Sequence, residues 1–183
     1  MDNDTGPYLI WDRIQPHLKL AGRDIYLVPE THLPFQPDVI LVEQDSWLVL
    51  GDQHTVKHDD RPAWVQANEL EDSPEYSPGT VIPASGMPVR LTAIIYALGK
   101  QPACQPEWAE RALRRVVQYC QEHDLKRLQL PVLGYRHGGL ELQQFTDLLY
   151  TVLHDSPHGM PVTIMIGLSD LSIRNRILEL LKS

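Results

Sequence analysis

Short apolar runs recur along the chain and predict the strands of a β-sheet. Most of them do not alternate with polar residues, which is the pattern of strands covered on both faces. The sheet is therefore expected to be central, and either mixed or parallel. The predicted strands are Ile25–Val28, Asp38–Glu43, Ser46–Leu50, Thr92–Leu98, Arg127–Leu133 and Val162–Leu168.

Between the later strands the apolar spacing changes to that of amphipathic helices. One helix is predicted after Pro106, a residue suited to a first helical position, and a second begins near Leu142. A third follows the candidate N-cap Ser169. The residues predicted to face the core include Val116, Val117, Phe145 and Ile177.

The resulting alternation of strand and helix implies right-handed crossovers, with helices on both sides of the sheet. The predicted fold class is thus α/β, a three-layer α/β/α sandwich with a central mixed sheet. We expect one domain over residues 1–183, with an N-terminal extension over about residues 1–24. The stretch 51–88 is rich in Pro, Asp, Glu and Gly, and is expected to form a long irregular loop with one short helical segment near residues 63–70.

The charge and the apolar content of the chain indicate which kinds of partner it is able to bind. The chain has 183 residues, with 24 acidic and 16 basic side chains and a formal charge of −8. Because phosphate contacts dominate binding to duplex nucleic acid, this balance argues against such a partner. No run approaches the roughly 18 apolar residues of a membrane span, and the acidic N-terminus does not resemble a leader, so we expect a cytoplasmic protein without a membrane partner. Cys104 and Cys120 lack disulfide-framework or metal-ligand spacing and are expected to be core thiols.

The segment "LQLPVLGYRHGGLEL" is the first candidate for chemistry, because a predicted strand runs directly into a glycine-bracketed loop. In open α/β sheets, ligands bind at the carboxyl ends of strands. The backbone N–H groups of such a loop can surround an anion, but the same glycines also suit a plain tight connection. The local pattern leaves both interpretations open.

Two further groups of residues are candidates for chemistry. His54 and His58 lie four apart in an acidic, breaker-rich segment, which favours a solvated loop, so no metal or cofactor is predicted. Glu43 and Asp45 lie at a strand exit, where they would form a general acid and base if they faced each other in a cleft, or would simply end the strand with polar groups.

Taken in order, these segments resemble a divergent macrodomain, whose α/β/α fold binds ADP-ribose. The resemblance covers about residues 25–181 and is strongest in the second half. There, "RLQLPVLG" resembles the strand that follows the family's long helix, and "GYRHGGLELQQFTDLL" resembles its phosphate-binding loop and next helix. In the first half, "DVILVEQDSWLVLGD" stands where the family has its asparagine- and glycine-rich ligand segment.

The resemblance implies which residues contact a ligand. Glu30 lies near the position of the family's acidic residue that accepts a hydrogen bond from the adenine amino group. Gly51 is the one glycine left at the position of the family's glycine triplet. The loop that would wrap the diphosphate consists of Gly134, Tyr135, Arg136, His137, Gly138 and Gly139.

Other positions depart from the family pattern. Asp45 stands where the family's functional asparagine contacts the distal ribose, and Val42 replaces an earlier asparagine. A carboxylate cannot donate hydrogen bonds as an amide does, and Asp52 would bring negative charge towards a diphosphate. The expected function is therefore a binding module for ADP-ribose or a related nucleotide or phosphate ligand, and the alternative is a degenerate macro fold serving as a scaffold or protein-interaction domain. Efficient ADP-ribosyl hydrolysis is not expected; Asp45 would be the catalytic residue if it served as a general base.

Overall fold

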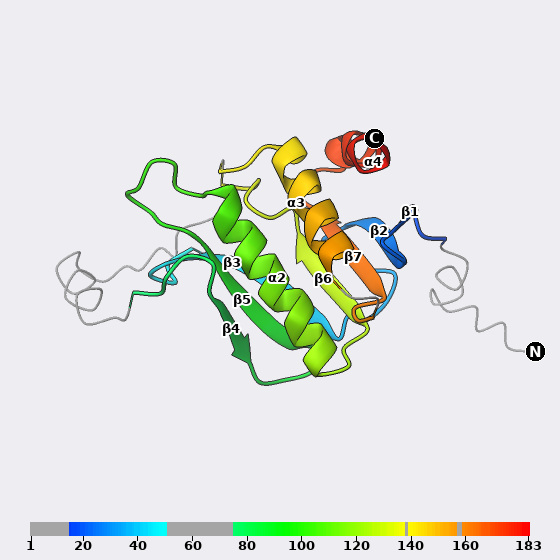
Figure 1. Ribbon diagram of the computed structural model, residues 1–183, viewed down its shortest axis with the longest axis horizontal. Helices are drawn as coiled ribbons and strands as arrows, with labels where there is room; N and C mark the ends of the chain where they lie inside the picture. Colours follow the sequence, from blue (N-terminus) through cyan, green and yellow to red (C-terminus); the bar gives the residue numbers. More distant parts are fainter. Residues whose placement is uncertain (1–14, 51–74, 138, 157–158) are drawn as a thin grey trace, which may run out of the picture.

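In this computed structural model, residues 15–50, 75–137, 139–156 and 159–183 are described. Seven strands form one mixed sheet in the order β1-β2-β7-β6-β3-β5-β4 (Figure 1). The four inner pairs, from β2·β7 to β3·β5, are parallel, whereas the edge strands β1 and β4 pair antiparallel with β2 and β5. The strands are β1 (Leu18–Leu20), β2 (Arg23–Pro29), β3 (Val39–Asp45), β4 (Val81–Ala84), β5 (Val89–Tyr96), β6 (Arg127–Pro131) and β7 (Thr163–Leu168).

The described helices share one core with the sheet: the two longest lie side by side across one of its faces, and the last lies beside the second of these (Figure 1). They are α2 (Pro106–Glu122), α3 (Leu142–Asp155) and α4 (Arg174–Lys182), the last preceded by the short 3₁₀ helix η2 (Leu171–Ile173). Pro106 begins α2 as predicted, and α3 begins with a capping box between Glu141 and Gln144.

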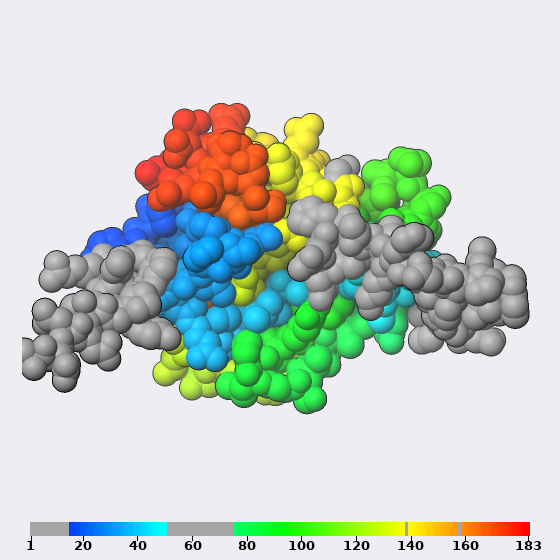
Figure 2. Space-filling view, turned by 180° about the vertical axis from the view of Figure 1, so that it is seen from behind, coloured from blue at the N-terminus to red at the C-terminus, as the bar shows by residue number. Residues whose placement is uncertain are grey.

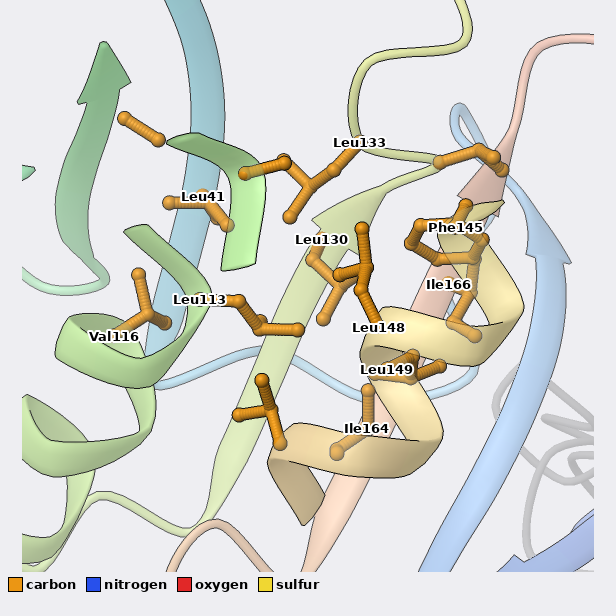
Figure 3. Packing of buried hydrophobic residues seen from close by; sticks show 14 of the residues in the cluster. Leu41, Leu113, Val116, Leu130, Leu133, Phe145, Leu148, Leu149, Ile164 and Ile166 are labelled. Carbon is orange, nitrogen blue, oxygen red and sulfur yellow. The ribbon is translucent and has the colours of Figure 1, made fainter. Parts of the chain in front are cut away.

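The main core lies between the sheet and these helices. Figure 3 shows Leu113 and Val116 of α2 and Leu149 of α3 directed towards side chains of the sheet. The four predicted core residues, Val116, Val117, Phe145 and Ile177, are at most 1% exposed, which confirms the helical periods. Cys104 and Cys120 are buried free thiols, as predicted.

A smaller cluster covers part of the opposite face. Tyr26, Val28 and Met165 pack there against Leu33 and Phe35, from the segment that links β2 to β3. The rings of Tyr26 and Phe35 meet edge to face, with 5.3 Å between their centroids. In the space-filling view from behind, the blue residues of β2 and the following segment are visible near the centre of this face, and α4, in red, lies above them in the view (Figure 2).

Several predicted boundaries are wrong. The predicted strand Ser46–Leu50 is a turn, ending in a single bridge residue, and Ser169 does not cap α4, because Asp170 caps η2 and Ile173 precedes α4. Strand β1 and the start of β2 lie inside the expected N-terminal extension, and β4 lies inside the expected irregular loop. The short helix expected near residues 63–70 lies outside the described residues. Within the described ranges, no helix is long and apolar enough to cross a membrane.

Candidate functional site

The candidate site is a pocket of about 180 Å³ where the central parallel strands end. Parallel strands bring their carboxyl ends to the same edge of a sheet, so residues distant in sequence meet there. Strands β3, β6 and β7 contribute most of the lining, and the segments after β2 and β6 complete it. The lining residues are Glu30, Ile40, Leu41, Val42, Glu43, Gln129, Leu130, Pro131, Arg136, His137 and Gly167.

The loop after β6 bends tightly at Gly134, whose φ of +76° is a conformation that favours glycine. Its carbonyl oxygen accepts hydrogen bonds from the N–H groups of Gly139, at 3.0 Å, and Leu140, at 2.8 Å. A Cβ atom at Gly134 would lie 2.6 Å from the Cγ of Leu140. The glycines therefore close a compact turn between β6 and α3.

Glu43 connects this loop to β3. Its carboxylate accepts a hydrogen bond of 2.5 Å from the N–H of Gly134, 91 positions later in the chain. Burial raises the pKa of Glu43 to about 7, although the Gly134 hydrogen bond and the positive charge of Arg136 act in the opposite direction. Glu43 is therefore able to gain or lose a proton near neutral pH.

Tyr96 and Cys104 are two further buried groups near Glu43. Among the described residues the buried Tyr96 hydroxyl has no partner at hydrogen-bond geometry, although it lies near Glu43 and the backbone of His137. Burial raises the pKa of Tyr96 and that of Cys104, the latter to about 12, and the nearby Glu43 adds to both shifts. Both groups therefore stay neutral at physiological pH.

Arg136 and Glu30 form an ion pair across the pocket. Glu30 follows β2 and Arg136 follows β6, and since β7 lies between those strands the pair crosses the end of β7. A Cβ atom at Gly167 of β7 would lie 3.0 Å from the Cγ of Glu30. The Arg136 side chain is 16% exposed and that of Glu30 is 30% exposed, so the pair is partly shielded from water.

Asp45 has a different setting from the other candidates. It is fully buried, and its carboxylate accepts hydrogen bonds from the N–H groups of Trp47, Val49 and Leu50, at 2.7, 3.0 and 2.9 Å. These bonds hold the turn in which Leu48 has a φ of +58°. They also explain why Ser46–Leu50 is not a strand, because the carboxylate takes backbone groups that a strand would pair with its neighbour.

The remaining predicted site residues are placed as follows. His137 lies in the pocket, with its ring edge to face against Tyr96 at 5.2 Å between centroids, and Tyr135 lies on the outer side of the loop, 37% exposed. Gly139 packs against Cys104 so closely that a Cβ atom there would overlap it. Gly51, His54, His58 and Gly138 lie outside the described residues. Among those that are described, no group of three or more His, Cys, Asp or Glu side chains could hold a metal ion.

Sequence reasoning considered Glu43 only as one half of a pair with Asp45, and missed Tyr96 and Gly167. The structure separates the pair, because Glu43 lines the pocket whereas Asp45 holds a turn. One signal was available for Tyr96. It ends the strand next to β3, and the ends of neighbouring parallel strands lie together.

No family model and no curated protein matches this sequence. Solved structures do match. A macrodomain of Oceanobacillus iheyensis, solved with MES bound, is 17% identical, with a TM-score of 0.64 over 90% of this chain and 94% of the other. A Trypanosoma brucei macrodomain in complex with ADP-ribose is 14% identical, with a TM-score of 0.64 over 92% of this chain and 74% of the other. The chain therefore has the macrodomain fold, and the predicted α/β/α fold class around a mixed sheet is confirmed.

Proposed function

We propose that this macrodomain-fold chain binds a nucleotide-type ligand, ADP-ribose or a related nucleoside diphosphate, at the pocket beneath the loop after β6. One observation carries the proposal: the N–H of Gly134 in this loop already holds an anionic group, the carboxylate of Glu43. Backbone N–H groups in a glycine turn are suited to anions, and a guanidinium beside them strengthens the binding of phosphate. Matching macrodomains solved with ADP-ribose or ADP add support for this class of ligand.

The ligand groups are assigned by charge. In this proposal Arg136 and the N–H of Gly134, which Glu43 occupies in the absence of ligand, meet the diphosphate, and Glu30, just after β2, accepts a hydrogen bond from the base. Ion pairing of Arg136 with Glu30 occupies both side chains in the absence of ligand. Since pockets for drug-sized ligands span roughly 300–1,000 Å³, the pocket of about 180 Å³ must widen, and separation of this pair would widen it. Asp45 takes no part in the chemistry and serves to hold the turn after β3.

Isothermal titration calorimetry with ADP-ribose, ADP, AMP and inorganic phosphate tests the proposal. We expect the nucleoside diphosphates to bind with at least micromolar affinity, on the order of −8 kcal/mol. Arg136→Ala should weaken binding about tenfold, because it removes a charge-assisted contact to the diphosphate.

The matched control is Arg114→Ala, which removes an arginine paired with Glu110 and Asp155 on the helical side of the molecule. It should bind as the wild type does. If no nucleotide produces heat or a thermal shift, the proposal is wrong, and a scaffold or protein-interaction role replaces it.

A further inference from the structure

Glu43 places a carboxylate inside the pocket that the proposed ligand would enter. It lines the pocket together with Arg136 and His137, and it accepts the N–H of Gly134. A phosphate that reached Arg136 and His137 would therefore meet a second anionic group in a space of about 180 Å³. Two negative charges in one shielded pocket repel each other strongly, because solvent screening is weak there.

We propose that Glu43 controls the affinity of this pocket for a diphosphate, because its carboxylate is an internal anion that competes with the ligand for the N–H of Gly134. The inference rests on the function proposed above. A diphosphate binds well only when Glu43 is protonated, so binding at pH 8, where the free carboxyl group is mostly ionised, takes up about one proton. The fold thereby couples ligand affinity to pH through a side chain that need not contact the ligand itself.

Few of the other ionisable groups near Glu43 could make ligand affinity depend on pH. Tyr96, from β5, and Cys104, after it, are neutral across the neutral range, as described above. Arg136 carries a constant positive charge, and Glu30 is its ion-pair partner. His137 is a further ionisable side chain that lines the pocket, so the experiment must separate its effect from that of Glu43.

The size of the effect follows from the protonated fraction. With the pKa of Glu43 at about 7, roughly nine-tenths of the molecules are competent at pH 6 and about one-tenth at pH 8, and the apparent Kd scales inversely with that fraction. The Kd of the wild type should therefore rise about tenfold between pH 6 and pH 8.

The probe is ADP-ribose, whose diphosphate is linked on both sides and so has no ionisation between pH 6 and 8. AMP is avoided, because its phosphate monoester titrates near pH 6. Calorimetry at pH 6, 7 and 8 should show the tenfold rise for the wild type. Glu43→Gln should bind equally well at all three values and about tenfold more tightly than the wild type at pH 8.

The control variant is Glu122→Gln, which removes one exposed carboxylate at the end of α2. Its pH profile should match that of the wild type. His137→Gln should retain the dependence on pH, since Glu43 is still present. A profile that becomes flat in His137→Gln but not in Glu43→Gln would overturn the inference.

The remaining outcomes separate the two proposals. If the affinity of the wild type does not change between pH 6 and 8, the inference is wrong and the proposed function is unaffected. This measurement uses only the wild type, so it is valid even if Glu43→Gln does not fold. An absence of binding by both the wild type at pH 6 and a folded Glu43→Gln overturns the proposed function and the inference together. Binding by Glu43→Gln alone at pH 8 supports both.

Discussion

Replacing Glu43 with Gln should stabilise the fold, and the gain should depend on pH. Burial raises the pKa of Glu43 from 4.5 to about 7 in the folded protein. Below pH 4.5 the carboxyl group is protonated in both the folded and unfolded states and makes no difference. As the pH rises from about 4.5 to about 7, the unfolded chain loses the proton while the folded protein retains it, so the free energy of unfolding falls.

The magnitude follows from the shift. Each pKa unit is worth about 1.4 kcal/mol, so a shift of this size lowers the free energy of unfolding by about 3 kcal/mol at pH 8. At pH 6, where the unfolded chain has ionised and most folded molecules have not, the loss is about 2 kcal/mol. A glutamine has no charge to bury, and its side-chain oxygen can still accept the N–H of Gly134.

Urea unfolding of the wild type and Glu43→Gln at several values between pH 4.5 and pH 8 measures this difference. Glu43→Gln should be the more stable protein at pH 8 by about 3 kcal/mol, and the gap should close towards pH 4.5. Glu122→Gln, an exposed change, should follow the wild type. A difference between wild type and Glu43→Gln that stayed constant with pH would refute the argument, because it would show that Glu43 titrates at the same pH in both states.

Two further substitutions probe the loops beside the pocket. Asp45→Ala should destabilise the protein by about 3 kcal/mol, since it leaves the half-buried N–H groups of Trp47 and Val49 without an acceptor and removes one of the two acceptors of the Leu50 N–H. A urea midpoint equal to that of the wild type would contradict the structural role of Asp45. Gly134→Ala should lower the melting temperature by several degrees, corresponding to at least about 2 kcal/mol. The alanine would have to adopt a positive φ, and its Cβ atom would overlap the buried Leu140. Calorimetric melting checks this, and an unchanged transition would show that the loop can rearrange.

Much of the secondary structure could be predicted because it depends on residues that are close together in the sequence. The core side of α2 follows from the helical spacing of its apolar residues, and the first residue of the helix follows from Pro106. The parallel strands could be recognised because both of their faces are covered, so their sequences are continuously apolar. The segment Ser46–Leu50 has the same composition, yet it is a turn, because Asp45 holds its backbone N–H groups.

The position of the candidate pocket was also predictable, since a strand ending in a glycine loop marks the carboxyl edge of a sheet. Its chemistry was decided by residues far apart in sequence. Glu43 meets the N–H of Gly134 across 91 positions, and Arg136 meets Glu30 across 106. These contacts depend on the strand order β2-β7-β6-β3, which local sequence patterns do not specify. The sequence alone thus determined the parallel strands, the described helices and the glycine loop. Only the tertiary structure added the antiparallel edge strands and placed a buried carboxylate beneath that loop, because strand pairing, burial and neighbouring charges are properties of the packed chain.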